Sequence, residues 1–250
     1  MNFAAIIIGD EIMSGKRQDK HMPKVIETLK ERGLQLSWCQ YLGDDPDDIT
    51  AALRRTLGAG DVVFCFGGIG ATPDDHTRQC AARAAGVELE LHPEAEAEIR
   101  ARFGAEITPN RLKMGEFPAG AAIIPNPHNR IPGFSFNRHY FLPGFPEMAW
   151  PMMAWVLDTH YRELFEPGAI AESSIIVRGA GESQLIDLMN ECQARFLRLK
   201  VFSLPRMGHD RYIELGVRGD PGEVEAAIAD LKRGVDALGF NWTEFRNADG

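Results

Sequence analysis

The chain has 250 residues, 44% of them hydrophobic, and a formal net charge of −9 at pH 7. This length allows one large domain or two smaller ones, and the hydrophobic fraction is enough for a packed core. The acidic balance argues against a nucleic-acid-binding surface, because such surfaces need clustered lysine and arginine, and we identify no cluster that offsets the negative charge locally.

Cysteine usage and hydropathy indicate the cellular compartment. The four cysteines are scattered and include no C-x-x-C pair: Cys39, Cys65, Cys80 and Cys192. This pattern is typical of small buried thiols in a reduced protein and does not match a zinc site. The apolar run over residues 3–8 is too short for a signal peptide, and no stretch approaches the length of a membrane span. We therefore expect a cytoplasmic protein without a membrane or nucleic-acid partner.

The first 85 residues alternate between strand and helix patterns. Short apolar runs predict buried strands over residues 3–8, 34–42 and 61–66. Apolar residues at helical spacing predict helices over 19–33, 46–58 and 76–85, the last within a helix-like stretch that begins near Pro73. Strands joined through helices by short connections are parallel, with right-handed crossovers and helices on both faces of the sheet.

Each of these three strands ends in glycine followed closely by carboxylate. The tips read Gly9-Asp10-Glu11, Gly43-Asp44-Asp45 and Gly67 through Asp75. Ligands of open parallel sheets bind beyond the carboxyl ends of the strands, so neighbouring strands would bring these tips together. Each tip taken alone is more typical of a capped helix start, but three on one sheet edge favour a site.

The third tip holds three glycines in four positions, Gly67-Gly68-Ile69-Gly70, and then Asp74 and Asp75. Glycines there let a ligand approach the backbone amides, and a following helix N-terminus favours phosphate. Adjacent carboxylates repel phosphate unless a divalent cation lies between them. A glycine turn whose aspartates cap a helix is an equally good interpretation of this stretch alone. It is not a Walker loop or a dinucleotide fingerprint, and the chain has no Gly-x-Ser-x-Gly elbow.

Residues 93–164 continue with mixed patterns. We expect an acidic surface helix over 93–103, an irregular segment over 108–120, a strand over 121–124 and a hairpin of strands 134–136 and 140–142. The long loop over 125–133 offers His128, Asn129 and Arg130 as ligand donors. A fourth glycine–carboxylate tip, Pro143 to Glu147, precedes a helix over 148–164 whose methionines and tryptophans favour a core or a subunit interface.

The pattern changes after Pro167-Gly168. Strands over 173–177, 199–204 and 211–217 and helices over 181–194 and 223–238 predict a small β-α-β-β-α module. Its loop over 205–210 is typical of a plain turn, and residues 247–250 of a loose tail. We place the two domains at residues 1–167 and 168–250.

Four motifs in order resemble the molybdopterin-binding MoaB/Mog fold, and in particular the amino-terminal part of CinA-type competence/damage-inducible proteins. They are Gly9-Asp10-Glu11-Ile12, Gly43-Asp44, Gly67 to Thr77 and Leu142 to Glu147, and the resemblance covers roughly residues 1–165. The module after Gly168 resembles the KH-like segment that follows this domain in CinA proteins. No counterpart of their nicotinamide-mononucleotide deamidase domain follows in this sequence, so that activity is not expected.

The resemblance implies a three-layer αβα fold with a mostly parallel sheet and a homo-oligomer, a dimer or trimer. Mog-type members adenylylate or bind molybdopterin, CinA-type amino-terminal domains are associated with metal-dependent hydrolysis of ADP-ribose, and the related domain of eukaryotic FAD synthases hydrolyses FAD. It therefore implies a small-molecule phosphate ligand and a divalent metal, Mg, Mn or Co. The alternative is a molybdopterin-binding or carrier protein without chemistry.

The family's functional residues transfer by motif. Gly67, Gly68, Gly70 and Thr72 would cradle phosphate, with Asp74 beside them. Asp75 and Asp44 match the functional carboxylates and would hold the metal, and Asp10 with Glu11 form the neighbouring tip. Gly144 and Pro146 would form the far wall.

The chain departs from the family at several positions. Ile69 stands for the usual Thr of the glycine loop, Ala71 for the usual Pro, and Asp19 for the common Asn. The family's Gly-Thr-Ala-Pro-Gly stretch reads His128 to Gly133 here. These departures leave phosphate binding as the expectation and the identity of the substrate open.

Overall fold

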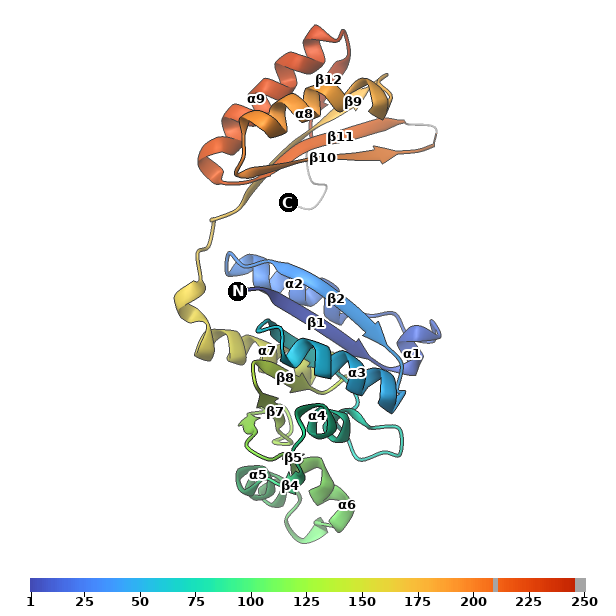
Figure 1. Ribbon diagram of the computed structural model, residues 1–250, viewed down its shortest axis with the longest axis vertical. Helices are drawn as coiled ribbons and strands as arrows, with labels where there is room; N and C mark the ends of the chain where they lie inside the picture. The colour runs from blue at the N-terminus through green and yellow to red at the C-terminus, as the bar shows by residue number, and fades with distance from the viewer. Residues whose placement is uncertain (209–210, 246–250) are drawn as a thin grey trace. The chain divides into compact units, whose positions relative to one another are not determined.

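The computed structural model describes residues 1–208 and 211–245. By its internal contacts the chain divides into two compact units, Met1–Phe165 and a second that begins at Glu166 (Figure 1). The end of the predicted turn over 205–210 and the predicted tail over 247–250 lie outside the described residues. No helix within the described ranges is long and apolar enough to cross a membrane.

The first unit is built on a six-stranded sheet with strand order β2-β1-β3-β8-β7-β6. Its strands are β1 (Phe3–Ile8), β2 (Leu36–Leu42), β3 (Val62–Phe66), β6 (Ala122–Ile124), β7 (Gly133–Phe136) and β8 (His139–Leu142). The first three and β8 run parallel, and only β7 runs against its neighbours. The mostly parallel α/β sheet predicted from the sequence is confirmed.

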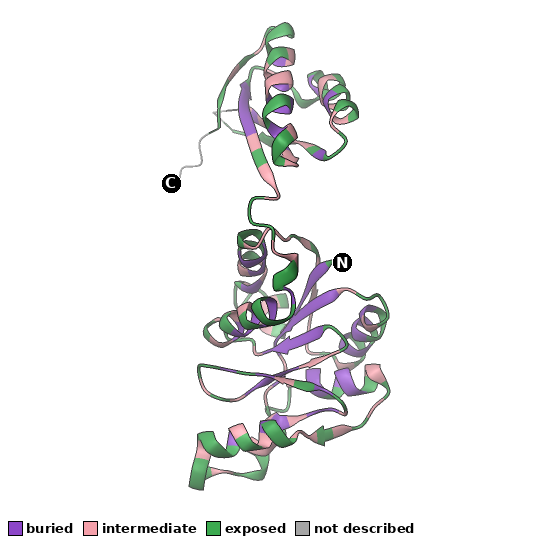
Figure 2. Cartoon of the chain, turned by 90° about the vertical axis from the view of Figure 1, so that its left-hand side faces the viewer, coloured by how far each residue is buried: buried purple, intermediate pink, exposed green. Residues whose placement is uncertain are grey.

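Helices cover both faces of this sheet. The α2 (His21–Glu31) and α7 (Pro146–His160) helices share one core cluster, and α3 (Pro46–Leu57) and α4 (Thr77–Ala85) share the other. Successive β1 residues alternate between the clusters, Ile7 in the first and Ile6 in the second. This is why β1 is a continuous apolar run, buried at every position (Figure 2). The result is the predicted three-layer αβα arrangement.

The segment between α4 and β6 is more regular than expected. It contains β4 (Leu89–Leu91), α5 (Pro93–Phe103), α6 (Pro109–Leu112) and β5 (Glu116–Pro118). The prediction of an irregular stretch over 108–120 was therefore wrong. Elements of three or four residues show no periodicity, and β5 exists because it pairs with β4 in a separate antiparallel ladder.

Three further boundaries differ from the predictions. A short helix, α1 (Asp10–Met13), begins at the first strand tip. The α4 helix begins at Thr77, not near Pro73, because residues 73–74 form a turn and residues 75–76 are not helical. The α7 helix starts at Pro146, whose fixed φ suits a first helical position, and ends at His160. Met152 and Met153 of α7 are fully buried, as its core interpretation requires, while Trp155 stays 37% exposed.

The second unit follows the predicted order with one strand added. It contains β9 (Ala171–Arg178), α8 (Ile186–Arg195), β10 (Leu199–Arg206), β11 (Tyr212–Gly219), α9 (Pro221–Ala237) and β12 (Asn241–Glu244). Its antiparallel sheet has the order β10-β11-β9-β12, and α8 and α9 share one core with it. The sequence analysis missed β12 because its four residues carry little apolar pattern and depend on pairing with β9. Single 3₁₀ turns lie at Gly104–Glu106, Lys113–Gly115, Arg162–Leu164 and Glu182–Gln184.

Candidate functional site

A cavity of about 490 Å³ opens where the parallel strands of the first unit end. Its wall includes residues from all four glycine–carboxylate tips: Gly9, Glu11, Asp44, Gly67, Gly68, Gly70, Thr72, Asp74, Asp75 and Gly144. Of the predicted site residues, Asp10 and Pro146 do not line it. The arrangement follows from topology, because β1, β2, β3 and β8 are parallel and adjacent.

The glycine loop, residues 67–72, is held against the sheet and α4. An added Cβ at Gly67 would lie 2.2 Å from the Ile8 carbonyl oxygen, and one at Gly68 would lie 2.2 Å from Thr77 Oγ1. Both glycines have positive φ, 103° and 67°. Thr77 donates from its amide to the Gly68 carbonyl and from its hydroxyl to the Gly67 carbonyl, each at 3.0 Å. Only glycine fits these two positions.

The same loop presents its amide groups without using them. Within the described part of the chain, the amides of Gly68, Ile69, Gly70 and Ala71 donate no hydrogen bond. All four residues line the cavity. Consecutive free amides on a concave surface form an anion-binding nest, so this loop is suited to phosphate.

Arg78 fixes the loop from behind. It is 2% exposed, and its guanidinium donates to the carbonyl oxygens of Gly70 (2.7 Å), Glu116 (3.2 Å) and Lys113. Its Nε has no partner among the described residues, and burial lowers the pKa of the side chain. Because the carbonyl of Gly70 is tied to Arg78, the loop is anchored and a cation lies close behind the nest.

Asp75 is used by the loop itself. Its carboxylate accepts hydrogen bonds from the Thr72 amide, at 2.8 Å, and from the Thr72 hydroxyl. The Asp75 amide in turn donates to the Thr72 carbonyl, and an added Cβ at Gly70 would lie 2.5 Å from the carboxylate. This carboxylate therefore shapes the turn that follows the glycines.

The first two tips, at Asp10 and Asp44, are joined by two reciprocal hydrogen bonds. The Asp10 amide donates to the Asp44 carboxylate at 2.9 Å, and the Asp44 amide donates to the Asp10 carboxylate at 3.1 Å. Partial burial raises the pKa of Asp44, and the negative charges of Asp10, Glu11 and Asp74 act in the same direction, while the bond from the Asp10 amide lowers it. Asp44 is thus a carboxylate whose charge would be stabilised by a cation in the cavity.

These carboxylates do not build a metal centre by themselves. The described residues contain no group of three or more His, Cys, Asp or Glu side chains that could hold a metal ion. The predicted pair of Asp44 and Asp75 therefore has no support as a ready-made metal site. Oδ2 of Asp75 already accepts two hydrogen bonds from Thr72, and the charges that act on Asp44 come from other carboxylates.

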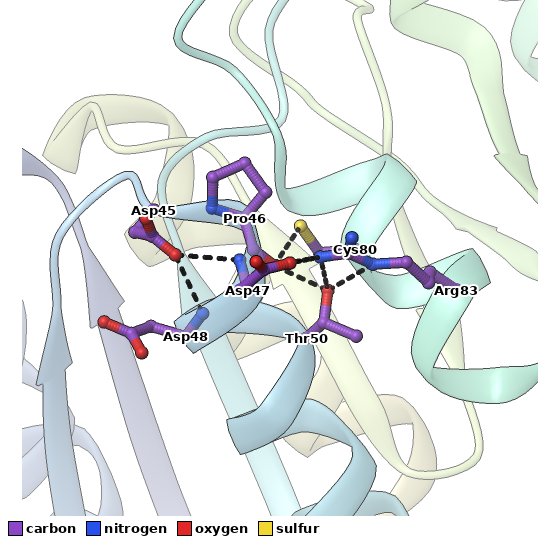
Figure 3. Close-up of polar contacts among 7 residues, drawn as sticks. All are labelled: Asp45, Pro46, Asp47, Asp48, Thr50, Cys80 and Arg83. Atoms are coloured by element: carbon purple, nitrogen blue, oxygen red, sulfur yellow. Dashed lines mark hydrogen bonds and ion pairs between the residues drawn. The ribbon is translucent and has the colours of Figure 1, made fainter.

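A contact between α3 and α4 lies next to the second tip (Figure 3). Asp45 caps α3 by accepting from the amides of Asp47 and Asp48 at 2.9 and 3.0 Å. From α4, the Cys80 thiol donates to the Pro46 carbonyl at 3.3 Å, and Arg83 Nε donates to the Thr50 hydroxyl at 2.9 Å. Arg83 also pairs with Asp47 at 3.1 Å. This contact joins the start of α3, which follows Asp44, to the middle and last turn of α4, which follows the glycine loop.

The opposite wall of the cavity is mostly apolar. It is formed by Met114, Ile131, Pro132, Phe145 and Met148, together with the amides of Asn126 and Asn129. Of the three donors predicted in the loop over 125–133, only Asn129 lines the cavity, and Arg130 instead pairs with Glu98 at 2.8 Å. A cavity with a polar nest on one side and apolar groups on the other suits a ligand that has phosphate and a planar ring.

Arg17 is a cavity residue that the sequence analysis missed. It lies in the connection between α1 and α2, close to Lys16 and Lys20 in the sequence. The sequence analysis did not single out these three closely spaced cations, which were the available signal. The connection has no periodic pattern, so its course back to the cavity could not be predicted.

A second cavity of about 300 Å³ adjoins the first and shares Ile8, Glu11, Arg17 and Gly144 with it. Its remaining wall is Ile7, Ile12, Gln18, Lys20, His21, Phe66 and Pro146. The His21 ring stacks on Phe66 with 4.4 Å between centroids. Asp19 positions His21 by accepting from its amide at 2.7 Å, and it also accepts from the Tyr41 hydroxyl.

Three comparisons place this architecture among known proteins. A family model described as "Probable molybdopterin binding domain" matches residues 4–162. A CinA-like protein of Anaeromyxobacter dehalogenans is 37% identical over 153 residues, which are 58% of this chain and 38% of that protein. A protein of Caldivirga maquilingensis is 32% identical over 223 residues, 86% of this chain and 84% of that protein.

Among solved structures, the protein CinA from Thermoplasma acidophilum, described as having unknown function, is similar at 30% identity and a TM-score of 0.58. The match covers 63% of this chain and 98% of that one. The chain spans little more than a third of the length of the Anaeromyxobacter relative. The family model covers well over half of this chain, including every strand of the parallel sheet and all four tips. The chain belongs to the molybdopterin-binding-domain family of MoaB/Mog type, with a CinA-like domain.

Proposed function

We propose that the 490 Å³ cavity binds a small molecule that carries a phosphate group and a planar ring. The observation that supports this most is the run of four unused amides from Gly68 to Ala71. Backbone amides bind phosphate without a full positive charge, and the buried guanidinium of Arg78 adds favourable potential from behind.

The apolar wall favours a ring at the other end of the ligand. Met114, Ile131 and Met148 offer contact area, and thioethers pack well against aromatic systems. A pterin such as molybdopterin has this chemistry, and so does the adenine of a nucleotide pyrophosphate. Membership of the family favours molybdopterin as the first ligand to test.

Metal-dependent hydrolysis of a pyrophosphate is the second candidate function. It is favoured by one observation, that Glu11, Asp44 and Asp74 line the same cavity as the free amides. Magnesium is commonly held by one or two carboxylates together with substrate phosphates, so the ligand would complete the site that the chain lacks. A bound metal would neutralise the pyrophosphate and lower the pKa of an attacking water. Asp44 would bind it, and the loop amides would stabilise the developing negative charge.

Calorimetric titration tests the binding proposal. Purified protein is titrated with molybdopterin and, separately, with ADP-ribose, each with and without excess inorganic phosphate as competitor. We expect saturable binding of at least one ligand, weakened by phosphate. Failure of both to bind a folded sample would refute the proposal.

Turnover is tested on ADP-ribose and FAD with Mg²⁺, Mn²⁺ or Co²⁺. Hydrolysis that is lost in Asp44→Asn while ligand affinity is retained would support the second candidate. Binding without turnover, or pterin fluorescence that copurifies with the protein, would instead support a binding or carrier role.

Three broader expectations accompany this proposal. We propose a cytoplasmic location, a homo-oligomer, and a KH-like identity for the module over 168–250. The oligomer is the easiest of these to test, and it is supported by Trp155 on α7, a large apolar side chain that is 37% exposed. Light scattering that reports a monomer would refute it.

A further inference from the structure

Two cations border the second cavity without partners. Arg17 and Lys20 line it, and neither side chain makes an ion pair or hydrogen bond with the described residues. Arg17 also lines the first cavity. In a chain of net charge −9, most arginines of the first unit contact carboxylates or carbonyls, as Arg32 and Arg83 do. Two unpaired cations at one cavity are therefore a local excess of positive charge.

The inner wall of this cavity is neutral and polar. His21 is 6% exposed, and burial lowers its pKa, so the ring is neutral at pH 7. Since the Gly144 carbonyl can only accept, His21 Nε2 carries the hydrogen and donates to it at 3.0 Å. Nδ1 then holds a lone pair with no partner among the described residues. A neutral imidazole adds no positive charge, so recognition of an anion there falls to Arg17 and Lys20.

The two cavities lie next to each other. They share four lining residues, Ile8, Glu11, Arg17 and Gly144, so a ligand in the first cavity lies close to the second. Glu11 also lies on the shared wall and would repel an anion placed midway. An anionic group in these cavities is therefore favoured at two separate places, the nest of residues 68–71 and the cation pair Arg17 and Lys20.

We propose that the second cavity is a subsite for a second phosphate group of the same ligand, bound by Arg17 and Lys20. This inference rests on the proposed function and narrows it to ligands with at least two phosphate groups, as a nucleotide pyrophosphate has and molybdopterin, with one, does not. Arg17, which lines both cavities, lies between the two groups, whereas Lys20 lines the second cavity alone. The planar guanidinium of Arg can donate two parallel hydrogen bonds to phosphate, and the ammonium of Lys adds a compact positive charge.

Tungstate tests this subsite, because it mimics phosphate and scatters X-rays anomalously. It has no ring, so the test does not depend on the identity of the rest of the ligand. Crystals of the full chain are soaked in tungstate, and the same anion is titrated calorimetrically in solution. We expect two anomalous peaks, one at the glycine loop and one between Arg17 and Lys20, and two sites per chain in solution. Lys20→Gln should lose the second site and keep the first, with at least a tenfold loss of affinity there.

Lys16→Gln is the matched control, because it removes a neighbouring cation that lines neither cavity. It should keep both sites. One peak at the glycine loop alone, or equal weakening of both sites by Lys16→Gln and Lys20→Gln, would overturn the inference and leave the proposed function standing. A peak at Arg17 and Lys20 alone would overturn the proposed function and, with it, the link between the two cavities.

Discussion

Two loops line the first cavity, and they differ in how their polar groups are bonded. The glycine loop of residues 67–72 leaves four amides without acceptors. In the loop of residues 125–133, polar side chains bond to the backbone of the loop itself. Asn126 accepts from the His128 amide and donates to the Ile131 carbonyl, both at 3.0 Å. Asn129 accepts from the Ile131 amide at 3.0 Å.

This difference shows that a donor is available to a ligand only when the fold does not already use it. The second loop contains more side-chain donors than the first, which is why the sequence analysis named His128, Asn129 and Arg130 as possible ligand donors. Its side chains replace the secondary structure that the loop lacks, whereas the first loop is held by Thr77 and Arg78 from α4. We therefore expect ligand affinity to depend on the first loop and local stability on the second.

The largest expected effect tests the anchor of the first loop. Arg78→Met should lower the free energy of unfolding of the first unit by about 3 kcal/mol, because three carbonyl oxygens lose the buried guanidinium that donates to them. Chemical denaturation measures this. The control is Arg100→Met, which removes only an exposed pair with Glu96 and should cost less than about 0.5 kcal/mol. Equal costs for the two variants would mean that Arg78 does not anchor the loop.

The next prediction separates the shape of the nest from simple backbone strain. Gly68→Ala should reduce ligand affinity about 100-fold, or 2.7 kcal/mol, because its Cβ would collide with Thr77 Oγ1 and displace the loop. Titration of the same ligand with both proteins measures the change.

Gly86→Ala is its matched control. Gly86 has a nearly equal φ of 72°, but a Cβ there meets nothing within 4 Å, and the residue lies at the far end of α4. Both variants should lose about 1 kcal/mol of stability from strain. Only Gly68→Ala should lose ligand affinity. Similar losses of affinity in both variants would show that the shape of the nest does not determine binding.

The contrast between the loops also explains how far the sequence could predict the molecule. The alternation of apolar strands and helices was enough for the first unit, because β1 and β3 are buried on both faces and read as unbroken runs. Parallel order then implied that residues following these strands lie at one edge. Local hydrophobic patterns of this kind predict the fold, because they follow directly from which residues are buried.

The use of individual polar groups could not be predicted in the same way. Asp75 has the residue type of a metal ligand, but one of its oxygens, Oδ2, accepts two hydrogen bonds from Thr72, three residues earlier. That spacing was the available signal for a turn. Arg17 and Arg78 escaped notice because nothing local distinguishes an arginine that lines a cavity from one on the surface. Such assignments depend on tertiary partners that only the structure shows.

A smaller effect tests the acidic tip that shares the cavity with the glycine loop. The folded-state pKa of Asp44 is raised, so its ionised form is disfavoured by folding at neutral pH, and this cost disappears as pH falls through that pKa. Asp44→Asn should therefore stabilise the protein by less than about 1 kcal/mol at pH 7 and lose this advantage below about pH 3. Denaturation across that pH range measures it. A gain that persists at low pH would assign the effect to the amide rather than to removal of charge.

The smallest effect on binding is expected in the second loop. Asn129→Ala removes the acceptor of the Ile131 amide and a contact with the Met148 sulfur at 3.1 Å, so stability should fall by about 1 kcal/mol. Affinity should change less than about twofold, below 0.5 kcal/mol, although Asn129 lines the cavity. His128→Ala, at an exposed position that does not line the cavity, should change neither quantity. A tenfold loss of affinity in Asn129→Ala would mean that this amide exchanges its internal partners for the ligand, and the two loops would then differ in their resting state rather than in their role.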